Sequence, residues 1–398
     1  MAAVTEAVII DVIRTPSGKG KPGGALSGVH PADLLAETLA TLVTRVGLDP
    51  ALVDDVIAGC VLQAAEQSAN IGRNAVLAAG FPISVPATTV DRACGSSQQA
   101  VHFAAQAVMS GVHDIVIACG VESMSRVPMG TPQMGLDPFG PRLAARYPDG
   151  LVGQGIAAER LAAAYGLTRE ELDAYAERSH ALAAATAAAG GFDAELVPVT
   201  RAGTDAMTAD ETIRASTSAA GLAGLRPSYV DDEMAARFPE IDWRITPGNS
   251  SPLTDGASAC LVMSAGRAAE LGLRPRARFH SFALAGADPV DMLTAPIPAT
   301  EKLLKVSGLT IDQIDAYEVN EAFAPVPLAW AKALGADPER LNPRGGAIAL
   351  GHALGASGVR LLTTMLNHLE QTGGRYGLQT MCEAGGQANA MLIERIDP

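Results

Sequence analysis

Aromatic side chains and positive charge are scarce in this chain. Phe, Trp and Tyr make up 4% of its 398 residues, and the excess of acidic over basic residues gives a net charge of −14. A nucleic-acid surface needs aromatic rings for base stacking and cations along the phosphate backbone, so we expect no nucleic-acid partner. An anionic ligand would have to be held by backbone N–H groups or by a few cations.

Long hydrophobic runs, a signal peptide and a metal-ligand pattern are also missing. No run of 18 uncharged apolar residues could span a membrane, and the first residues lack a basic start. The cysteines are odd in number and widely spread, which favours neither a disulfide framework nor a metal site. They are Cys60, Cys94, Cys119, Cys260 and Cys382. We therefore expect a cytoplasmic enzyme without a metal or a membrane anchor.

Strand-like and helix-like segments alternate, which predicts an α/β fold with a parallel sheet covered by helices. The expected strands are 6–12, 55–61, 114–119, 317–319 and 378–381, and the expected helices are 31–46, 96–110 and 155–189. Residues 124–147 are rich in Pro, Gly and Met, which predicts an irregular loop.

The chain also repeats itself. Gly47-Leu48 aligns with Gly308-Leu309 at an offset of 261 residues, and 93–97 aligns with 353–357 at an offset of 260. These matches indicate a duplicated α/β unit, with chance similarity in a chain rich in alanine and glycine as the alternative. The residues between the halves, about 124–248, have the composition of an insertion, which either carries specificity or only connects.

A glycine-rich segment near the start fits the dinucleotide-binding pattern G-x-G-x-x-G. It is Gly18-Lys-Gly20-Lys-Pro-Gly23, and it follows a predicted strand. That site requires a helix to begin inside the motif, so that the pyrophosphate meets the helix N-terminus. Here Pro22 and Gly24 intervene and the helix begins near Pro31, so we interpret the segment as a flexible loop.

Two cysteines and a histidine at glycine turns indicate a different site. Cys94, in DRACGSSQQA, lies where an extended segment enters a helix, and the helix dipole would favour its thiolate. His352 lies in the glycine-rich NPRGGAIALGHALGASG, Cys382 follows a predicted strand in CEAGGQ, and Asn320 begins NEAFA at another strand end. A Cys–His pair brought together by folding is the minimum for acyl transfer, although each residue alone could be structural. The other three cysteines lie in apolar runs and are expected core residues.

Taken together, these motifs make the chain similar to the thiolase family, the acetyl-CoA acetyltransferases and 3-ketoacyl-CoA thiolases. The resemblance runs from end to end through RTPSGK, DRACGSSQQA, GVESMSRVP, REELDAYAERSH, TPGNSSPLTDGASA, ADPVDMLTAPIPAT, NEAFA, NPRGGAIALGHALGASG and CEAGG. It implies a thiolase fold of duplicated βαβαβαββ halves, in a layered α/β/α/β/α core with an inserted loop domain. The expected N-terminal half is 1–123 continued by about 249–272, the loop domain is 124–248, and the C-terminal half is 273–398.

The resemblance also implies the reaction. A 3-oxoacyl-CoA would be cleaved by CoA to acetyl-CoA and a shortened acyl-CoA, or formed by the reverse Claisen condensation, in ping-pong steps without a cofactor. Cys94 would accept the acyl group, His352 would activate its thiol, and Cys382 would act as acid and base. Asn320 would hold a water that, with His352, stabilises the enolate oxygen. The family suggests a homodimer or a homotetramer.

The remaining residues implied by the resemblance bind substrate. The N–H groups of Cys94 and Ala384 would bind the oxyanion of the tetrahedral intermediate, with Gly385 in the same turn. Ser251 would contact the pantetheine part of CoA. With 5 lysines beside 24 arginines, the CoA phosphates are expected to meet arginine or solvent.

Three motifs depart from the usual family pattern. Ala353 replaces the proline of GHPLG, which relaxes the loop. Ala384 replaces a glycine of CxGGG, so the second anion site depends on the backbone angle there. Residues 153–155 read GQG where the family often has HMG, which favours larger, branched or ring-bearing acyl groups.

Two alternatives stay open. A condensing enzyme of the ketosynthase or hydroxymethylglutaryl-CoA synthase kind also uses a cysteine but generally lacks a second thiol such as Cys382. A non-enzymatic CoA- or lipid-binding relative would be expected to lose a catalytic residue, whereas Cys94, Asn320, His352 and Cys382 are all present.

Overall fold

The computed structural model describes residues 5–201 and 203–397. Its main sheet has ten strands: β1 (Ala7–Arg14), β2 (Gly18–Lys19), β3 (Asp55–Gly59), β4 (Ala87–Val90), β5 (Ile115–Ser123), β8 (Thr254–Ser264), β9 (Ala277–Gly286), β10 (Ala316–Val319), β11 (Tyr376–Glu383) and β12 (Gln387–Arg395). Their order is β10-β11-β12-β9-β1-β8-β5-β3-β4, with β2 beside β8. The strands β6 (Val199–Arg201) and β7 (Thr204–Met207) form a separate hairpin.

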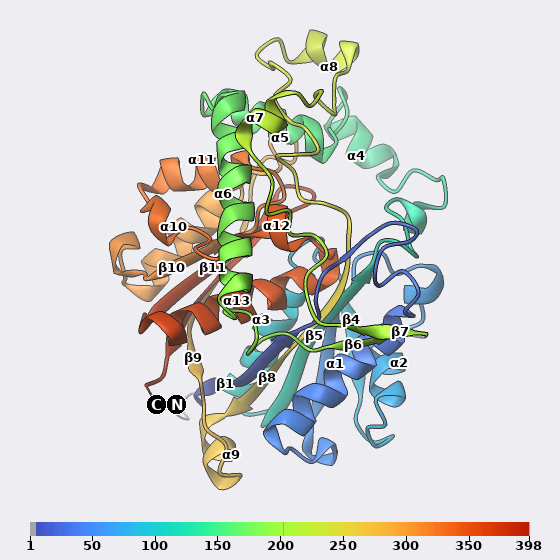
Figure 1. Ribbon diagram of the computed structural model, residues 1–398, viewed down its shortest axis with the longest axis vertical. Helices are drawn as coiled ribbons and strands as arrows, with labels where there is room; N and C mark the ends of the chain where they lie inside the picture. The colour runs from blue at the N-terminus through green and yellow to red at the C-terminus, as the bar shows by residue number, and fades with distance from the viewer. Residues whose placement is uncertain (1–4, 202, 398) are drawn as a thin grey trace.

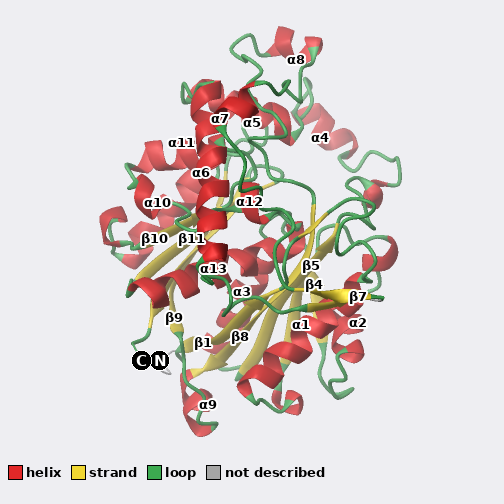
Figure 2. Cartoon of the chain, viewed as in Figure 1, coloured by secondary structure: helices red, strands yellow, loops and turns green. Residues whose placement is uncertain are grey.

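The helices surround and divide this sheet (Figures 1 and 2). They are α1 (Pro31–Val46), α2 (Ile71–Ala78), α3 (Ser96–Met109), α4 (Gly140–Arg146), α5 (Gln154–Ala164), α6 (Arg169–Ala188), α7 (Ala219–Ala223), α8 (Asp232–Arg237), α9 (Ala265–Glu270), α10 (Pro296–Ser307), α11 (Pro325–Leu334), α12 (Ala347–Leu350) and α13 (Ser357–Thr372). The predicted strands and helices are confirmed, with ends that shift by a few residues.

Four predictions need correction. The sheet expected to be parallel is mixed, because β8 pairs antiparallel with β1 and β5, and β12 pairs antiparallel with β9 and β11. The loop expected over 124–147 contains the short helix α4. The single helix expected over 155–189 is two helices, because the chain turns at Gly166 and Thr168 then caps α6 with a capping box. The glycine motif near residue 20 is no loose loop, because β2 pairs with β8 and the Glu211 carboxylate accepts the N–H groups of Lys19 and Ala25.

The duplicated unit is confirmed by strand pairing. In the first half β3 pairs parallel with β5, β5 antiparallel with β8, and β8 antiparallel with β1. In the second half β10, β11, β12 and β9 repeat the same three pairings in the same order. In the first half β4 also pairs with β3, whereas in the second half the corresponding pairing of β10 is a single parallel bridge between Tyr317 and Leu341. The boundaries at 123, 248 and 272 stay a prediction.

The layered core follows from the two central helices. Helices α3 and α13 pack on each other and touch strands of both halves, whereas α1 and α2 cover the first half and α10 and α11 the second. A helix between the two halves of the sheet has no face toward water, and every residue from 357 to 367 of α13 is buried. The N-terminal ends of α3 and α13 carry the turns of Cys94 and His352, so this central layer positions the site.

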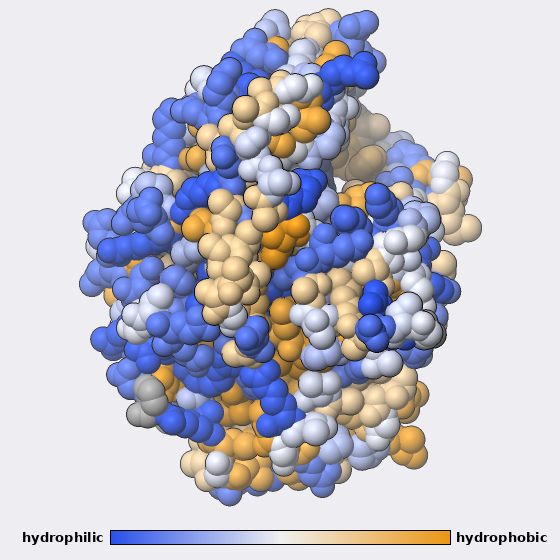
Figure 3. All heavy atoms as spheres, in the orientation of Figure 1, coloured by the Kyte–Doolittle hydropathy of each residue, from blue (hydrophilic) through white to orange (hydrophobic). Residues whose placement is uncertain are grey.

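Within the segment between the halves, α4, α5, α7 and α8 lie above the sheet in Figure 1 and α6 runs down toward it, whereas the β6–β7 hairpin lies lower, on the side of α1. In the space-filling view, hydrophobic residues form separate patches among hydrophilic ones (Figure 3). Over 5–201 and 203–397, no helix combines the length and the apolar character that crossing a bilayer requires.

Candidate active site

Cys94 lies in a tight turn between β4 and α3. Ala93 before it has a positive φ of 45°, and Gly95 after it is the N-cap of α3. The hydroxyl of Ser96 fixes the turn, because its oxygen accepts the Arg92 N–H at 2.9 Å and its proton is donated to the Ala93 carbonyl at 2.6 Å. The thiol is 4% exposed. The chain therefore places the thiol at a helix N-terminus, as predicted, but in the protein interior.

The expected thiolate character of Cys94 is wrong for the resting protein. Burial first, and then the charge of the nearby Glu383 carboxyl, raise the pKa of the Cys94 thiol to about 12. Loss of hydration destabilises the thiolate by more than the helix dipole stabilises it. Glu383 packs directly against the turn, since a Cβ added to Gly95 would lie 2.1 Å from its Oε1. Cys94 is therefore a neutral thiol that needs a base.

Cys382 lies at the end of β11, before the turn that leads into β12. It is 2% exposed, and its pKa is raised by burial first and then by the neighbouring Cys94. The turn uses positive φ angles at Gly385 (82°) and Gly386 (76°), whereas Ala384 has no positive φ. A side chain is therefore accommodated at 384 without backbone strain, which removes the objection that the missing glycine raised.

His352 is held by contacts to both halves of the molecule. Its N–H donates to Oγ1 of Thr254 on β8 at 2.9 Å, and its Nδ1 lies 2.6 Å from Oγ of Ser357. The Ser357 hydroxyl donates its proton to the Ala353 carbonyl at 2.8 Å, so toward Nδ1 it acts as an acceptor. Nδ1 then carries the proton and Nε2 has a free lone pair. Burial, and then the charge of Arg360, lower the pKa of His352 to about 3, which keeps the ring neutral.

Asn320 meets this free nitrogen. It follows β10, its N–H donates to the Thr380 carbonyl at 3.1 Å, and its Nδ2 lies 3.3 Å from Nε2 of His352. Two residues that are 32 positions apart in the sequence are thus brought together by the ends of β10 and α12. Oδ1 of Asn320 is buried and has no partner among the described residues.

The Ala353 departure has a simple geometry. Ala353 has φ −70°, which is the value that a proline ring imposes. Alanine therefore keeps the loop conformation and loses only the entropic advantage of proline in the unfolded chain.

Glu122 is a site residue that the sequence argument passed over. Its buried carboxylate accepts four hydrogen bonds, from the N–H groups of Val61 (3.0 Å), Leu62 (3.1 Å) and Gly355 (2.8 Å) and from Nε2 of Gln67 (2.6 Å). The bond to Gly355 ties the first half to the loop of His352. The signal was present, because a glutamate inside the apolar strand 115–123 needs partners.

Glu321 has the same function on the other side. Its carboxylate accepts from Tyr175 Oη (2.9 Å), Ser179 Oγ (2.7 Å), Asn342 Nδ2 (2.9 Å) and the Ile348 N–H (3.0 Å). Tyr175 and Ser179 belong to α6, so this buried residue fixes the inserted segment and the loop before His352 relative to β10. In NEAFA, the glutamate is therefore structural and the asparagine faces the histidine.

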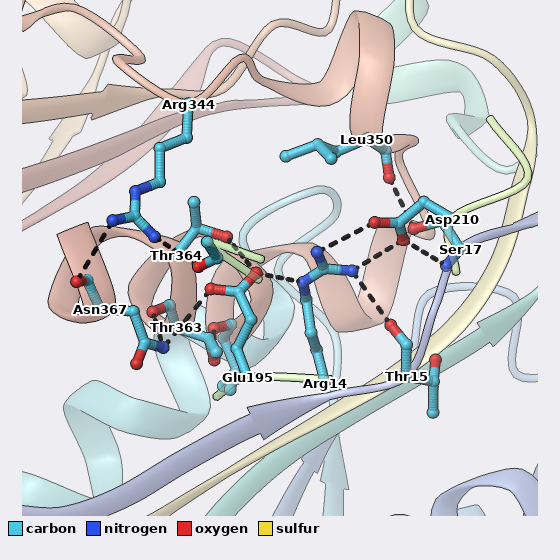
Figure 4. Close-up of polar contacts among 12 residues, drawn as sticks. Arg14, Thr15, Ser17, Glu195, Asp210, Arg344, Leu350, Thr363, Thr364 and Asn367 are labelled. Atoms are coloured by element: carbon cyan, nitrogen blue, oxygen red, sulfur yellow. Dashed lines mark hydrogen bonds and ion pairs between the residues drawn. The ribbon is translucent and has the colours of Figure 1, made fainter. Parts of the chain in front are cut away.

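A buried ion cluster joins the three parts of the chain beneath the His352 loop (Figure 4). Arg14 of β1 donates to Glu195 at 2.6 Å and to both oxygens of Asp210 at 2.8 and 3.0 Å. Thr364 and Asn367 of α13 also donate to Glu195. Figure 4 shows the two carboxylates on opposite sides of the guanidinium. The first half, the inserted segment and the second half are thus cross-linked by complementary charges.

A cavity of about 350 Å³ opens beside His352. Its wall is mainly apolar and includes Met124, Gln154, Tyr229, Ser251, Phe323, His352 and Leu354. Ser251 lies in this wall, and its Oγ donates to the Ala322 carbonyl at 3.1 Å. Cys94 and Cys382 do not border the cavity; Cys94 belongs to the buried cluster of Met124 and Leu354. Cys60, Cys119 and Cys260 are buried, as expected of core residues.

Within the described part of the chain, no three His, Cys, Asp or Glu side chains lie close enough to hold a metal ion.

Comparison with known proteins accounts for this arrangement. The model of the thiolase N-terminal domain matches residues 7–266, and that of the thiolase C-terminal domain matches 273–395. The chain belongs to the thiolase family. It is an acyltransferase that performs CoA-dependent thiolytic cleavage or the reverse condensation.

Individual relatives cover the whole chain. A steroid 3-ketoacyl-CoA thiolase, FadA6 of Mycobacterium tuberculosis, is 48% identical and covers 99% of this chain and 95% of its own. A 3-ketoacyl-CoA thiolase of Erwinia tasmaniensis is 45% identical, over 98% of this chain and 99% of its own. The crystal structure of the Bacillus anthracis acetyl-CoA acetyltransferase is 36% identical, with a TM-score of 0.89 and full coverage of both chains.

Proposed function

We propose that the thiolase reaction runs through an acyl thioester on Cys94, with His352 as its base, Cys382 as the second acid and base, and Asn320 beside the enolate oxygen. The observation that carries this proposal is the contact between Asn320 and Nε2 of His352 at the wall of the cavity. It brings the free lone pair of a neutral imidazole to the place where the substrate carbonyl would enter.

The first half-reaction breaks a carbon–carbon bond. The Cys94 sulfur attacks C3 of the 3-oxoacyl-CoA while its proton passes to Nε2 of His352. The N–H groups of Cys94 and Ala384 stabilise the tetrahedral oxyanion. The C2–C3 bond then breaks, the acyl group stays on Cys94, and the Cys382 thiol protonates the acetyl-CoA enolate.

The second half-reaction releases the shortened acyl-CoA. The Cys382 thiolate takes the proton of incoming CoA, and the CoA sulfur attacks the Cys94 thioester. The Cys94 thiolate leaves and is reprotonated by His352. A neutral thiol with a raised pKa suits Cys382, because an acid that must return its proton should not be ionised at rest.

For the substrate, we propose a 3-oxoacyl-CoA with a bulky or ring-bearing acyl group. Support comes from GQG at 153–155 in the cavity wall and from the similarity to a steroid 3-ketoacyl-CoA thiolase. A Cβ at Gly155 would lie 2.3 Å from the ring of Tyr229, so glycine at this position lets that ring form part of the wall. Ser251 and Gly385 would bind the CoA arm. We also propose a cytoplasmic homodimer or homotetramer, without a cofactor, divided at 123, 248 and 272.

A thiolysis assay tests the proposal. The protein is mixed with free CoA and either acetoacetyl-CoA or a 3-oxoacyl-CoA of a ring-bearing acid, and loss of the 3-ketothioester absorbance is followed. We expect a higher kcat/KM for the bulky substrate and no turnover by Cys94→Ala. Normal turnover by Cys94→Ala would refute the roles, and a preference for acetoacetyl-CoA would refute the substrate class.

A further inference from the structure

Arg360 is a buried cation that the reaction above does not use. It lies on α13, one turn after Ser357, and is 5% exposed. Its Nε, Nη1 and Nη2 are all buried without a hydrogen-bond partner in the described part of the chain. A guanidinium removed from water needs compensation by hydrogen bonds or opposite charge.

Its surroundings contain a small cavity behind the catalytic histidine. The cavity measures about 10 Å³ and is lined by Arg360, Ser357, Ala353, Ser17, Thr15 and Arg14, among others. This volume suffices for one water molecule. Arg14 is already bound to Glu195 and Asp210, so among the described residues the uncommitted guanidinium in this wall is that of Arg360.

The same cavity is lined by Ser357, which contacts Nδ1 of His352. Ser357 Oγ accepts from Nδ1 of His352 and donates to the Ala353 carbonyl. A hydroxyl oxygen has two acceptor positions, so one remains for a further donor.

We propose that Arg360 is a positioning residue for His352. The Arg360 guanidinium donates to one water in this cavity, and this water donates in turn to the Ser357 hydroxyl oxygen. The chain of donors turns the Ser357 proton toward Ala353 and thereby keeps the proton of His352 on Nδ1. Nε2 stays unprotonated and faces Asn320. No proton is transferred by Arg360, which acts only through the tautomer and the orientation of the ring.

The charges around Arg360 decide how it affects pH dependence. Glu318, Glu321 and Glu195 attract its charge and Arg14 repels it. Burial is the larger cause of the lowered His352 pKa, and the positive charge of Arg360 lowers this pKa further. Replacing Arg360 by a neutral residue therefore raises the pKa of His352, and the acidic limb of kcat/KM moves to higher pH.

A double-mutant cycle tests the inference, which rests on the proposed role of His352. Arg360→Met and Ser357→Ala are made alone and together, and thiolysis is measured between pH 3 and 9, a range that includes the lowered pKa of His352. We expect each single change to lower kcat/KM by roughly 10- to 100-fold, as for other residues that orient a catalytic group. In the Ser357→Ala protein, Arg360→Met should cost less than about twofold, because the path to His352 is already broken.

The controls separate this inference from the function itself. Arg344→Met removes another buried guanidinium, which is bound to the Gly191 carbonyl and Gln371, and its effect should be the same with and without Ser357. Equal costs of Arg360→Met in both backgrounds, or an unmoved acidic limb, would overturn the inference. If Arg360→Met does not fold, Arg360→Gln carries the same cycle and the same two outcomes. A wild-type protein without thiolysis would instead overturn the proposed function.

Discussion

Glu383 offers a direct test of how burial and charge control the nucleophile. Its side chain is fully buried, both of its oxygens lack a partner within the described residues, and it lies against the turn of Cys94. Burial raises its own pKa to about 8, and its charge raises the pKa of the Cys94 and Cys382 thiols. Glu383→Gln keeps the shape of the side chain and removes its charge. It should therefore lower the pKa of the Cys94 thiol relative to wild type, with an effect seen above pH 8, where Glu383 of the wild type is ionised.

The size of the effect follows from the two pKa values. With a Cys94 pKa of about 12, the thiolate fraction at pH 9 is on the order of 10⁻³. A like charge in contact shifts a pKa by roughly one unit or more, so removing it should raise the thiolate fraction about tenfold. Below about pH 7 the Glu383 carboxyl is mostly protonated, and the two proteins should then react alike.

Alkylation by iodoacetamide measures this fraction without relying on turnover. The rate of Cys94 modification is followed by peptide mass spectrometry from pH 6 to 10 in wild type and Glu383→Gln. Glu318→Gln is the matched control, since Glu318 is also buried with a pKa raised to about 8 but does not act on Cys94. Superimposable curves for wild type and Glu383→Gln, or an equal gain in Glu318→Gln, would refute the reasoning.

Four further substitutions test the packing. Gly95→Ala would place a Cβ 2.1 Å from Oε1 of Glu383, so it should cost about 1–3 kcal/mol in a urea titration and slow thiolysis; an unchanged midpoint would contradict this contact. Gly385→Ala should lower the free energy of unfolding by about 1–2 kcal/mol, because Gly385 has a φ of 82°. Ala384→Gly should change this free energy by less, because Ala384 has no positive φ. Equal changes for the two substitutions would contradict this geometry of the turn. Arg14→Met leaves two buried carboxylates uncompensated and should lower the unfolding free energy by about 3–5 kcal/mol, and a loss below 1 kcal/mol would argue against the cluster.

Local signals in the sequence were sufficient for the elements and for the identity of the reacting residues. Helix 31–46 was predicted to the residue because Pro31 and Gly47 mark its ends. Cys94, Asn320, His352 and Cys382 were found because each lies at a glycine turn or a strand end, where side chains of an α/β enzyme face its ligand.

The ionisation states of these residues could not be predicted from local signals. The helix N-terminus beside Cys94 suggests a thiolate, but burial and the charge of Glu383 override it, and Glu383 lies almost 300 positions away in the sequence. The contact of Arg360 with the cavity of Ser357 is equally invisible, because an arginine on a helix gives no sign of which layer will cover it. Glu122 was recognisable, since a lone carboxylate in an apolar strand has to be satisfied.

The acyl-enzyme on Cys94 is the most direct test of the proposed mechanism. Wild type and Cys94→Ser are incubated with acetyl-CoA in the absence of free CoA, quenched in acid, and digested for mass spectrometry. We predict an acetyl thioester on the peptide that contains Cys94 in wild type, with release of one CoA for each acetyl group bound. An acetyl group on Cys382, or turnover of the wild type without any acyl-Cys94, would contradict the mechanism.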